Sequence, residues 1–408
     1  MQSFAYRYKP VHAAFEKLVG ILSPLFPVPE GKPLVDPPRK ILVLKFGGVG
    51  EAVLARSLVE HLRRRNPVMD FDFLVEDRTM EAMTSGTACK VISYNPRKEG
   101  LNRAIKTVRQ IRSRTYDAVL DFEPHSTLTA GFMRATSIPA RIGLVAPEPS
   151  PRSRFLTHPV QLREDESMWK AFVRMGHILD PELPETLTTI PLPCSAESER
   201  SLDEWWAREI GNDKESRVVA MHVGVGPSAQ YRRWPIERFV HFATAMLTFR
   251  KNLIVILTGG ASEQPLIDAF KSSFGGRTVD ASALGRLEST AALLRRCDLL
   301  VSGDTGIMHL GAAMGTPTVG LFGPNTPKCW GPVGARATWV YPTRQPCSPC
   351  INSYKRRIPE RCTATVESAC MWDIGVLDVL EAARTVIHDP WLGVLNGSLT
   401  SGHKGHSS

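Results

Sequence analysis

The chain has 408 residues; 43% of them are hydrophobic and 22% are charged, and it contains 31 glycines and 31 prolines. This composition is typical of a globular enzyme, it excludes a disordered chain, a collagen-like repeat and a disulfide-bonded miniprotein, and the length predicts two or three domains. Lys and Arg number 50 against 41 Asp and Glu, and the formal charge of +9 favours an anionic partner such as a nucleotide, a phosphorylated substrate, a nucleic acid or an acidic membrane.

Residues 1–38 form a segment of their own. Apolar residues recur there at helical spacing, and prolines then end any helix. The apolar positions are Phe15, Leu18, Val19, Ile21, Leu22 and Leu25, and the prolines are Pro24, Pro27, Pro29 and Pro33. Two interpretations stay open: a helix packed on the body of the protein, and a basic amphipathic helix lying on a membrane surface.

The sequence indicates neither a membrane-spanning helix nor a signal peptide. No run of about 18 apolar residues occurs, and Glu16 and Lys17 interrupt the apolar part of the N-terminus. We therefore expect a cytoplasmic protein, with peripheral contact on the cytoplasmic face of the inner membrane if the N-terminal helix binds lipid.

Short apolar strands alternate with helical patterns from residue 39 onwards, which is typical of a doubly wound parallel sheet. The expected strands of the first half are 40–45, 71–76, 91–94, 118–122 and 141–145, and the expected helices are 52–65, 78–87 and 100–114. Residues 163–211 read as largely helical and polar. We place a first Rossmann-like domain at 39–205.

A second alternating series follows and predicts a second Rossmann-like domain at 206–345. Its expected strands are 217–223, 253–257, 277–280, 299–302 and 318–322, and its expected helices are 235–249, 263–273, 288–296 and 307–314. Residues 346–395 comprise a cysteine-containing loop and a last helix at about 373–387. The Gly-, Ser- and His-rich residues 396–408 are expected to be disordered.

The most informative segment joins the strand at 299–302 to the helix at 307–314. Asp304, Thr305 and Gly306 stand between them, where the carboxyl end of a strand meets a helix N-terminus that can offer free N–H groups to an anion. This placement predicts a diphosphate site. The alternative is that Asp304 only caps the helix and that its two neighbours fill the turn.

Two further loops should reach the same edge of the second sheet. Ser228 follows the first strand there, and Arg232 opens the next helix, so a hydroxyl and a guanidinium could both bind phosphate. Glu263 repeats the strand-to-helix geometry one unit later, and it either accepts from ribose hydroxyls or caps its own helix. The glycines at 47–50 do not fit a dinucleotide fingerprint or a P-loop, because the third glycine and the Gly-Lys-Ser/Thr are missing.

Taken in order, these motifs are similar to glycosyltransferase family 9, the lipopolysaccharide heptosyltransferases, along nearly all of residues 40–390. The matching stretches are Gly-Gly-Val-Gly-Glu at 47–51, Arg-Arg-Trp-Pro at 232–235, Thr-Gly-Gly-x-x-Glu at 258–263, Asp-Thr-Gly-x-x-His-Leu-x-Ala-Ala at 304–313, Gly-Thr-Pro-Thr-Val-Gly-Leu-Phe-Gly-Pro-Asn-Thr-Pro at 315–327, and a Cys-x-x-Cys loop. The resemblance implies an α/β GT-B fold, in which two Rossmann-like doubly wound domains face a central cleft. It also implies an inverting transfer from a nucleotide-diphospho-sugar that requires no metal or other cofactor.

The resemblance assigns roles to individual residues. It makes Glu51 the catalytic carboxylate, at a position where the family pattern has Asp, and it places Arg232 where the family has a donor-phosphate Lys. The other matches to the donor site are Ser228, Asp304, Thr305, Gly306 and His309. Chemistry agrees, because one carboxylate must deprotonate the acceptor and cations or N–H groups must hold the leaving diphosphate. The alternative for Glu51 is a first-turn carboxylate that only complements the helix dipole.

The resemblance further implies a sugar transfer, with heptose from ADP-heptose as the expected donor, to a lipopolysaccharide-core-like glycan of the cell envelope. Two alternatives stay open: a transferase of the same fold with another nucleotide-sugar donor, and a nucleotide-sugar-binding protein without activity. Neither the acceptor linkage nor the oligomeric state follows from these residues.

A basic stretch at 97–114 includes Arg103, Lys106 and Arg109. In family members the first domain binds an anionic glycolipid acceptor, so these side chains could capture that anion; equally, they could form an ordinary solvated helix face. A nucleic-acid partner is not expected, because the stretch lacks interleaved aromatic residues.

Four cysteines in the C-terminal part form the one metal-like pattern. They are Cys347, Cys350, Cys362 and Cys370. Their intervals differ from those of common zinc ribbons, so a structural zinc or iron–sulfur site and a set of paired or free thiols both stay open. We assign no metal to catalysis.

Overall fold

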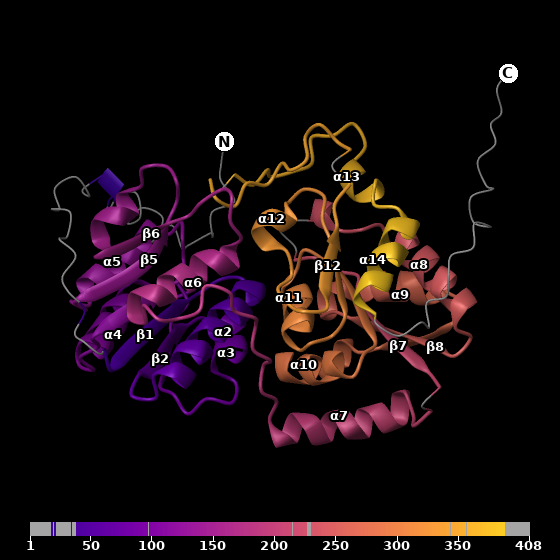
Figure 1. The fold of residues 1–408 in the computed structure, drawn as a ribbon, viewed down its shortest axis with the longest axis horizontal. Helices are drawn as coiled ribbons and strands as arrows, with labels where there is room; N and C mark the ends of the chain where they lie inside the picture. The colour runs from indigo at the N-terminus through magenta and orange to yellow at the C-terminus, as the bar shows by residue number, and fades with distance from the viewer. Residues whose placement is uncertain are drawn as a thin grey trace.

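Two parallel six-stranded sheets covered by helices form the body of the molecule (Figure 1). The computed structural model describes residues 18, 20–21, 34, 38–96, 98–213, 215–226, 230–342, 344–355 and 357–387. The strand orders are β3-β2-β1-β4-β5-β6 and β12-β11-β10-β7-β8-β9, so each sheet has the arrangement of a doubly wound nucleotide-binding domain. The predicted GT-B fold class is confirmed.

The first sheet spans residues 40–161. Its strands are β1 (Lys40–Lys45), β2 (Asp70–Val75), β3 (Val91–Ser93), β4 (Ala118–Asp121), β5 (Ala140–Val145) and β6 (His158–Gln161). Its helices are α2 (Val49–Arg65), α3 (Asp77–Thr84), α4 (Leu101–Arg112), α5 (Thr127–Ala135) and α6 (Met168–Leu179), with a 3₁₀ turn η2 (Pro151–Phe155).

The second sheet repeats the pattern. Its strands are β7 (Arg217–His222), β8 (Leu253–Thr258), β9 (Arg277–Asp280), β10 (Leu299–Gly303), β11 (Thr318–Leu321) and β12 (Ala337–Val340). Its helices are α7 (Ala196–Glu209), α8 (Ile236–Phe249), α9 (Gln264–Ser273), α10 (Leu287–Arg295), α11 (Gly306–Ala313), α12 (Pro327–Trp330), α13 (Ala369–Trp372) and α14 (Val376–Val386), with 3₁₀ turns η3 (Gln230–Arg232), η4 (Ala261–Glu263) and η5 (Ser282–Leu284).

The central strand β1 shows why these apolar runs form sheets. Its four middle residues are fully buried, as expected for a parallel strand covered on both faces. Ile41 and Val43 join the core on the face that carries α2 and α6, and Leu42 and Leu44 join the core beneath α4. Side chains alternate across a strand, so one apolar run supplies both layers.

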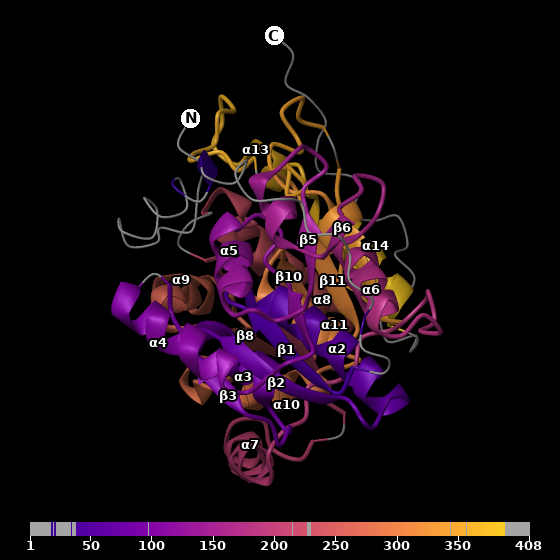
Figure 2. The same cartoon turned by 90° about the vertical axis from the view of Figure 1, so that its left-hand side faces the viewer.

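The two faces of the first sheet have different neighbours. The core on the α2 face continues into the second domain, where Leu310 and Met314 belong to the same cluster of buried residues. Helices α4 and α5 cover the opposite face, which Figure 2 shows turned towards the viewer. The α2 side of the first domain therefore packs on the second domain, and the α4–α5 side lies away from it.

The sequence-based prediction missed helix α5 and the strands β6 and β12, and it also missed the four-residue helices α12 and α13. Both strands have four residues and lie at sheet edges, where burial imposes a weaker apolar pattern, and β6 contains Pro159. The domain boundary expected between residues 205 and 206 falls inside α7, which is one helix and packs on α10.

The termini bear on two of the predictions. Most of the segment 1–38 and all of 396–408 lie outside the described residues, so their predicted structure stays a prediction. Among the residues that are described, no helix is long and apolar enough to cross a bilayer.

Candidate active site

Each sheet has one point where the strand order reverses, and in open α/β sheets ligands bind there, beyond the carboxyl ends of the strands. That point lies between β1 and β4 in the first sheet and between β7 and β10 in the second. The loop after β1 leads to Glu51, and the loop after β10 carries Asp304. Both predicted residues therefore lie where this fold binds ligands.

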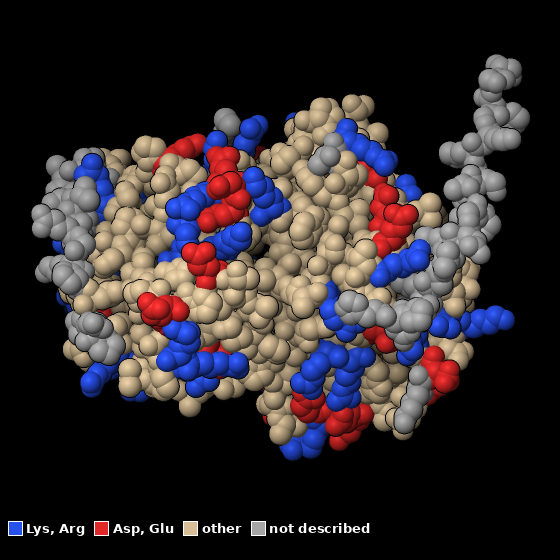
Figure 3. Space-filling view, in the orientation of Figure 1, with Lys and Arg blue, Asp and Glu red and all other residues tan. Residues whose placement is uncertain are grey.

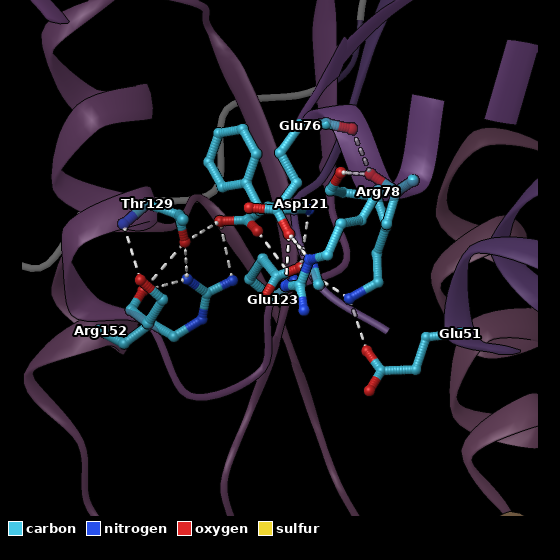
Figure 4. A network of polar contacts seen from close by, with 12 residues as sticks. Glu51, Glu76, Arg78, Asp121, Glu123, Thr129 and Arg152 are labelled. Atoms are coloured by element: carbon cyan, nitrogen blue, oxygen red, sulfur yellow. Dashed lines mark hydrogen bonds and ion pairs between the residues drawn. The ribbon is translucent and has the colours of Figure 1, made fainter. Parts of the chain in front are cut away.

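A lysine between two carboxylates forms the first half of the site (Figure 4). Lys45, at the end of β1, places its Nζ 2.5 Å from Glu51 Oε2 and 2.6 Å from Glu123 Oε1; the two glutamates are labelled in Figure 4. Glu123 Oε1 also accepts hydrogen bonds from the backbone N–H groups of Phe46 and Gly47. Lys45 and Glu123 are buried, whereas 26% of the Glu51 side chain is exposed. Glu51 is thus the member of this triad that a substrate can reach.

Burial and neighbouring charges set the protonation of this triad. Burial opposes the charge on Lys45, but the carboxylates of Glu123 and Glu51 more than offset it, so the pKa of Lys45 is raised. Burial alone would raise the pKa of Glu123. The charge of Lys45 and the two backbone N–H groups have a larger opposite effect, so the pKa of Glu123 is lowered. Burial raises the pKa of Glu51; Lys45 lowers it, and the charges of Glu123 and Asp304 raise it again, for a net upward shift.

A second buried ion pair holds the end of β4. Asp121 Oδ2 lies 2.9 Å from Arg152 Nη2 and accepts from the Thr129 hydroxyl at 2.9 Å, and its Oδ1 accepts from the Glu123 N–H at 3.0 Å (Figure 4). Asp121 and Arg152 are fully buried. These contacts fix the backbone from which Glu123 reaches Lys45.

The second half of the site lies at the start of α11. Asp304 Oδ2 accepts from Arg232 Nη1 at 3.2 Å and from Asn325 Nδ2 at 2.8 Å. The N-cap of α11 is Thr305, and no side chain caps the helix, so the alternative in which Asp304 is only a cap is wrong. The first N–H groups of α11 are left without a side-chain acceptor, which suits an anionic ligand.

The starts of α2 and α11 touch across the two domains. A Cβ atom at Gly50 would lie 2.5 Å from His309 Cδ2, and one at Gly306 would lie 2.9 Å from Val49 Cβ. Only glycine allows this approach. These contacts bring the start of α2, which carries Glu51, next to Gly306 and His309, residues about 250 positions later in the chain. The charge of Asp304 acts on the pKa of Glu51, in agreement with this closeness.

This contact makes a testable prediction for Gly50→Ala. The added methyl group would push the buried His309 ring away and separate the two helix starts. We expect kcat of the reaction at this site to fall about 100-fold, because displacements near 1 Å cost that much when two reacting groups must meet. Gly275→Ala is the matched control, since nothing lies within 4 Å of its Cβ. Unchanged turnover in Gly50→Ala would contradict the close approach.

Two histidines belong to the second domain's part of the site: His309 in α11 is buried, and His222 at the end of β7 is half-buried. Burial lowers the pKa of His309 to about 4, with Asp304 acting in the opposite direction, and burial likewise lowers the pKa of His222 to about 4. Both rings are therefore neutral at pH 7. His309 Nδ1 is buried and has no hydrogen-bond partner among the described residues, and its ring packs edge-on against Trp330. His309 can thus offer one unused polar nitrogen to a ligand.

Two other predicted donor residues have different outcomes. Glu263 Oε2 accepts a hydrogen bond from the Gly260 N–H at 2.9 Å, so Glu263 caps the turn to which it belongs. The Glu263 side chain also packs against Gly224, which follows β7. Its predicted contact with ribose stays a prediction. Ser228 lies outside the described residues.

The predicted acceptor residues lie apart from the Glu51–Asp304 contact. Arg103, Lys106 and Arg109 all belong to α4, on the face of the first sheet that points away from the second domain. Arg103 is bound to Glu99 Oε1 and to the Ser93 carbonyl. Arg109 lines a separate cavity between α4 and α5.

The four C-terminal cysteines are free thiols in this structure. In the described part of the chain, no three His, Cys, Asp or Glu side chains are placed to hold a metal ion. The loop that carries them crosses to the first domain, where the Tyr354 hydroxyl donates to the Glu166 carbonyl and His125 Nε2 contacts the Ser353 carbonyl. The structure thus gives this loop a bridging role beside the site.

Sequence reasoning missed three residues of the site: Lys45, Glu123 and Asn325. Lys45 ends β1 and Glu123 lies two residues after β4, the two strands that flank the reversal point of the first sheet, so the strand order, once known, would have indicated them. Asn325 lies in the Gly-Pro-Asn-Thr-Pro run at 323–327, which had carried the resemblance without a role for any of its residues.

The chain is similar to known proteins along most of its length. The family model of glycosyltransferase family 9 (heptosyltransferase) matches residues 104–358. The lipopolysaccharide core heptosyltransferase OpsX of Haemophilus influenzae is 21% identical over 300 residues, which cover 72% of this chain and 81% of that protein. Lipopolysaccharide heptosyltransferase 2 of Escherichia coli is 21% identical over 318 residues, covering 73% and 86%.

Solved structures show the same fold. The ADP-heptose lipopolysaccharide heptosyltransferase II of Escherichia coli aligns with a TM-score of 0.66 at 19% identity, over 85% of this chain and 98% of that one. A family 9 glycosyltransferase of Veillonella parvula aligns with a TM-score of 0.69 at 20% identity, over 87% and 99%.

Proposed function

The chain belongs to glycosyltransferase family 9, the heptosyltransferase family, and from this premise we propose that it moves a heptose from ADP-heptose onto a lipopolysaccharide core, with inversion and without a metal. Family membership makes the chain a glycosyltransferase that acts on lipopolysaccharide core. The donor, the stereochemistry and the residue roles below belong to the proposal.

One observation carries the residue roles: the reachable carboxylate of the first domain faces the donor-type loop of the second. Glu51 stands at the start of α2, and Asp304 influences its charge from the start of α11. An inverting transfer needs a base on one side of the reacting carbon and the leaving group on the other. In this proposal the base comes from the first domain, at the start of α2, and the leaving-group site from the second, at the start of α11.

Glu51 acts as the base in this proposal. It takes the proton of an acceptor hydroxyl while the hydroxyl oxygen bonds to the anomeric carbon. The bond from that carbon to the diphosphate oxygen breaks, the electron pair leaves with the diphosphate, and the single displacement inverts the carbon. The raised pKa of Glu51 favours this role, because a general base works best when its pKa approaches the working pH.

Arg232 and the start of α11 hold the leaving diphosphate. The Arg232 guanidinium lies beside Asp304, and its buried Nε has no hydrogen-bond partner among the described residues. The N–H groups at Thr305 and Gly306 open a helix whose dipole favours negative charge. Together they can stabilise the charge that develops on the diphosphate, so the reaction requires no metal.

A transfer assay tests the function as a whole. The purified protein is incubated with lipopolysaccharide core acceptor and, in separate reactions, ADP-heptose, other ADP-sugars and UDP-sugars, each with and without EDTA. Mass spectrometry detects the product and NMR gives the configuration of the new linkage. We expect transfer from ADP-heptose with inversion and full rate in EDTA. Preference for another sugar donor would refute ADP-heptose as the donor. A product with retained anomeric configuration would refute the inverting displacement, and loss of activity in EDTA would refute metal independence.

The phosphate site makes its own prediction for Arg232→Ala. Losing a charged hydrogen-bond donor to the diphosphate should weaken ADP-heptose binding about 10- to 150-fold, because such bonds contribute about 1.5–3 kcal/mol. Isothermal titration calorimetry measures the Kd. Arg250→Ala, an exposed arginine at the end of α8, is the control and should bind as the wild type does. Equal affinity in Arg232→Ala and wild type would remove the assigned phosphate site.

A further inference from the structure

A cavity of about 490 Å³ lies between α4 and α5, on the face of the first domain away from the second. Its lining is apolar, with Phe46, Tyr94, Val108, Leu128 and Phe132 among its residues. The volume falls in the range of small-molecule sites, about 300–1,000 Å³. The proposed transfer reaction uses none of these side chains, so the cavity has no assigned ligand.

One end of the cavity adjoins the catalytic edge of the sheet. Phe46 follows β1 directly, and its backbone N–H donates to Glu123 in the carboxylate triad. Leu101 and Leu128 lie at the starts of α4 and α5, and Arg112 and Ala135 lie at their ends. The cavity thus runs along both helices, away from the triad.

Large apolar side chains surround the opening. Leu101 is 50% exposed and Ile105 42% exposed, and both line the cavity. Leu18, which also lines it, and Ile21 are exposed as well. A cluster of exposed apolar residues beside an apolar cavity is typical of an interaction site and not of an ordinary solvated surface.

Among the described residues, basic charges outnumber acidic ones on this apolar surface, where Glu99 pairs with Arg103 at the start of α4. Helix α4 carries Arg103, Lys106, Arg109 and Arg112 and no acidic residue, and Arg109 and Arg112 line the cavity. From residue 100 to 147 the acidic residues are Asp117, Asp121 and Glu123.

None of these three acids offsets the basic helix. Asp121 and Glu123 are buried in the ion pairs described above, and Asp117 accepts from the backbone at the start of β1, at the opposite edge of the sheet. On the view in Figure 3, by contrast, acidic and basic side chains are interspersed.

We propose that the α4–α5 face docks on an anionic phospholipid bilayer, with one acyl chain entering the cavity and Lys106 and Arg109 contacting the lipid phosphates. An apolar cavity flanked by basic side chains is complementary to a lipid, whose acyl chain is apolar and whose headgroup is negative. Each Lys or Arg that lies near an anionic membrane surface adds to the binding free energy. Docking in this way places the triad beside the membrane surface. The proposal concerns a partner of the enzyme and holds whichever sugar is transferred.

Vesicle co-sedimentation of the full-length chain tests the docking. Vesicles are made of phosphatidylcholine alone or with phosphatidylglycerol at a third of the lipid. We expect binding to the anionic vesicles only, weakened by salt, and about tenfold or more weaker in Lys106→Glu/Arg109→Glu and in Ile105→Glu. The controls are Lys251→Glu and Val68→Glu, exposed positions of matched chemistry elsewhere, which should bind as the wild type does.

A photoreactive phosphatidylglycerol with a diazirine in its acyl chain tests the cavity itself. We expect cross-links within 101–112 and 127–135, and their loss in Val108→Trp, which fills the cavity. Absence of cross-links in the full-length chain, or equal wild-type binding to both vesicle types, would overturn the proposal.

Donor affinity, turnover of a delipidated core acceptor and melting temperature are measured for every variant. We expect them to stay unchanged in the surface variants, which separates docking from catalysis and from folding. A wild type that docks but transfers no sugar would refute the proposed reaction and leave docking intact. A Lys106→Glu/Arg109→Glu variant with normal melting but impaired turnover of the delipidated acceptor would overturn the docking assignment.

Discussion

Replacing Glu51 with glutamine is expected to lower kcat by about 10²–10⁴-fold while donor affinity stays unchanged, because the amide keeps the shape of the side chain but cannot take a proton. Stopped assays with ADP-heptose and core acceptor give kcat, and calorimetry gives the Kd of the donor. Glu237→Gln is the matched control: Glu237 is an exposed glutamate in the first turn of α8, so it complements a helix dipole just as the non-catalytic interpretation of Glu51 requires. Equal, small effects in both variants would contradict the base assignment.

The pH dependence of the wild type gives a second test of the same residue. Glu51 must be deprotonated to accept a proton, and its pKa is raised. The value of kcat/KM should therefore fall on the acid side at a higher pH than an ordinary carboxylate allows, and rise to a plateau above that pKa. This limb should be absent from the residual activity of Glu51→Gln. A limb that persists in the variant would assign the titration to another group.

Replacing Lys45 with methionine should have the largest effect on stability. Lys45 is fully buried and neutralises Glu51 and Glu123, so its removal leaves two carboxylates close together without a cation. Breaking a buried ion pair from one side costs about 3–5 kcal/mol, and we expect a loss of that size in the free energy of unfolding. Urea denaturation at pH 7 measures it. Sugar transfer should also fall, because Glu51 loses the charge that keeps it ionised.

Two further variants make this measurement specific. Lys40→Met removes the lysine at the other end of β1, whose Nζ donates to the Arg114 carbonyl, and it should cost no more than about 1 kcal/mol. Lys45→Met combined with Glu123→Gln should recover part of the lost stability, since the second change removes one stranded charge. If Lys45→Met and Lys40→Met destabilise the protein equally, Lys45 does not hold a charged triad.

Most of the sheets could be predicted from the sequence because their inner strands are buried on both faces. A strand that is buried on both faces has a continuous apolar run in its sequence, as in β1 and β10. The turn residues that follow such a run indicate where the next helix begins. The edge strands β6 and β12 need less apolar sequence, so this signal does not find them. Helix α5 also went unpredicted, between the strands β4 and β5, which the apolar pattern did locate.

The site could be predicted only where its residues belong to local motifs. Glu51, Arg232 and Asp304 stand at strand-to-helix junctions, and a glycine-rich or small-residue turn marks each of them in the sequence. Lys45 reads as the polar end of a strand, and its partner Glu123 is 78 residues away. A contact of that kind depends on the strand order, which no local pattern encodes.

The most direct measurement of the central claim is a structure of the enzyme with ADP-heptose bound. The account predicts the diphosphate against Arg232 and the N–H groups of Thr305 and Gly306, with the anomeric carbon turned towards Glu51 and room for an acceptor hydroxyl between them. A donor bound with its anomeric carbon turned away from Glu51, or with its diphosphate far from α11, would contradict it.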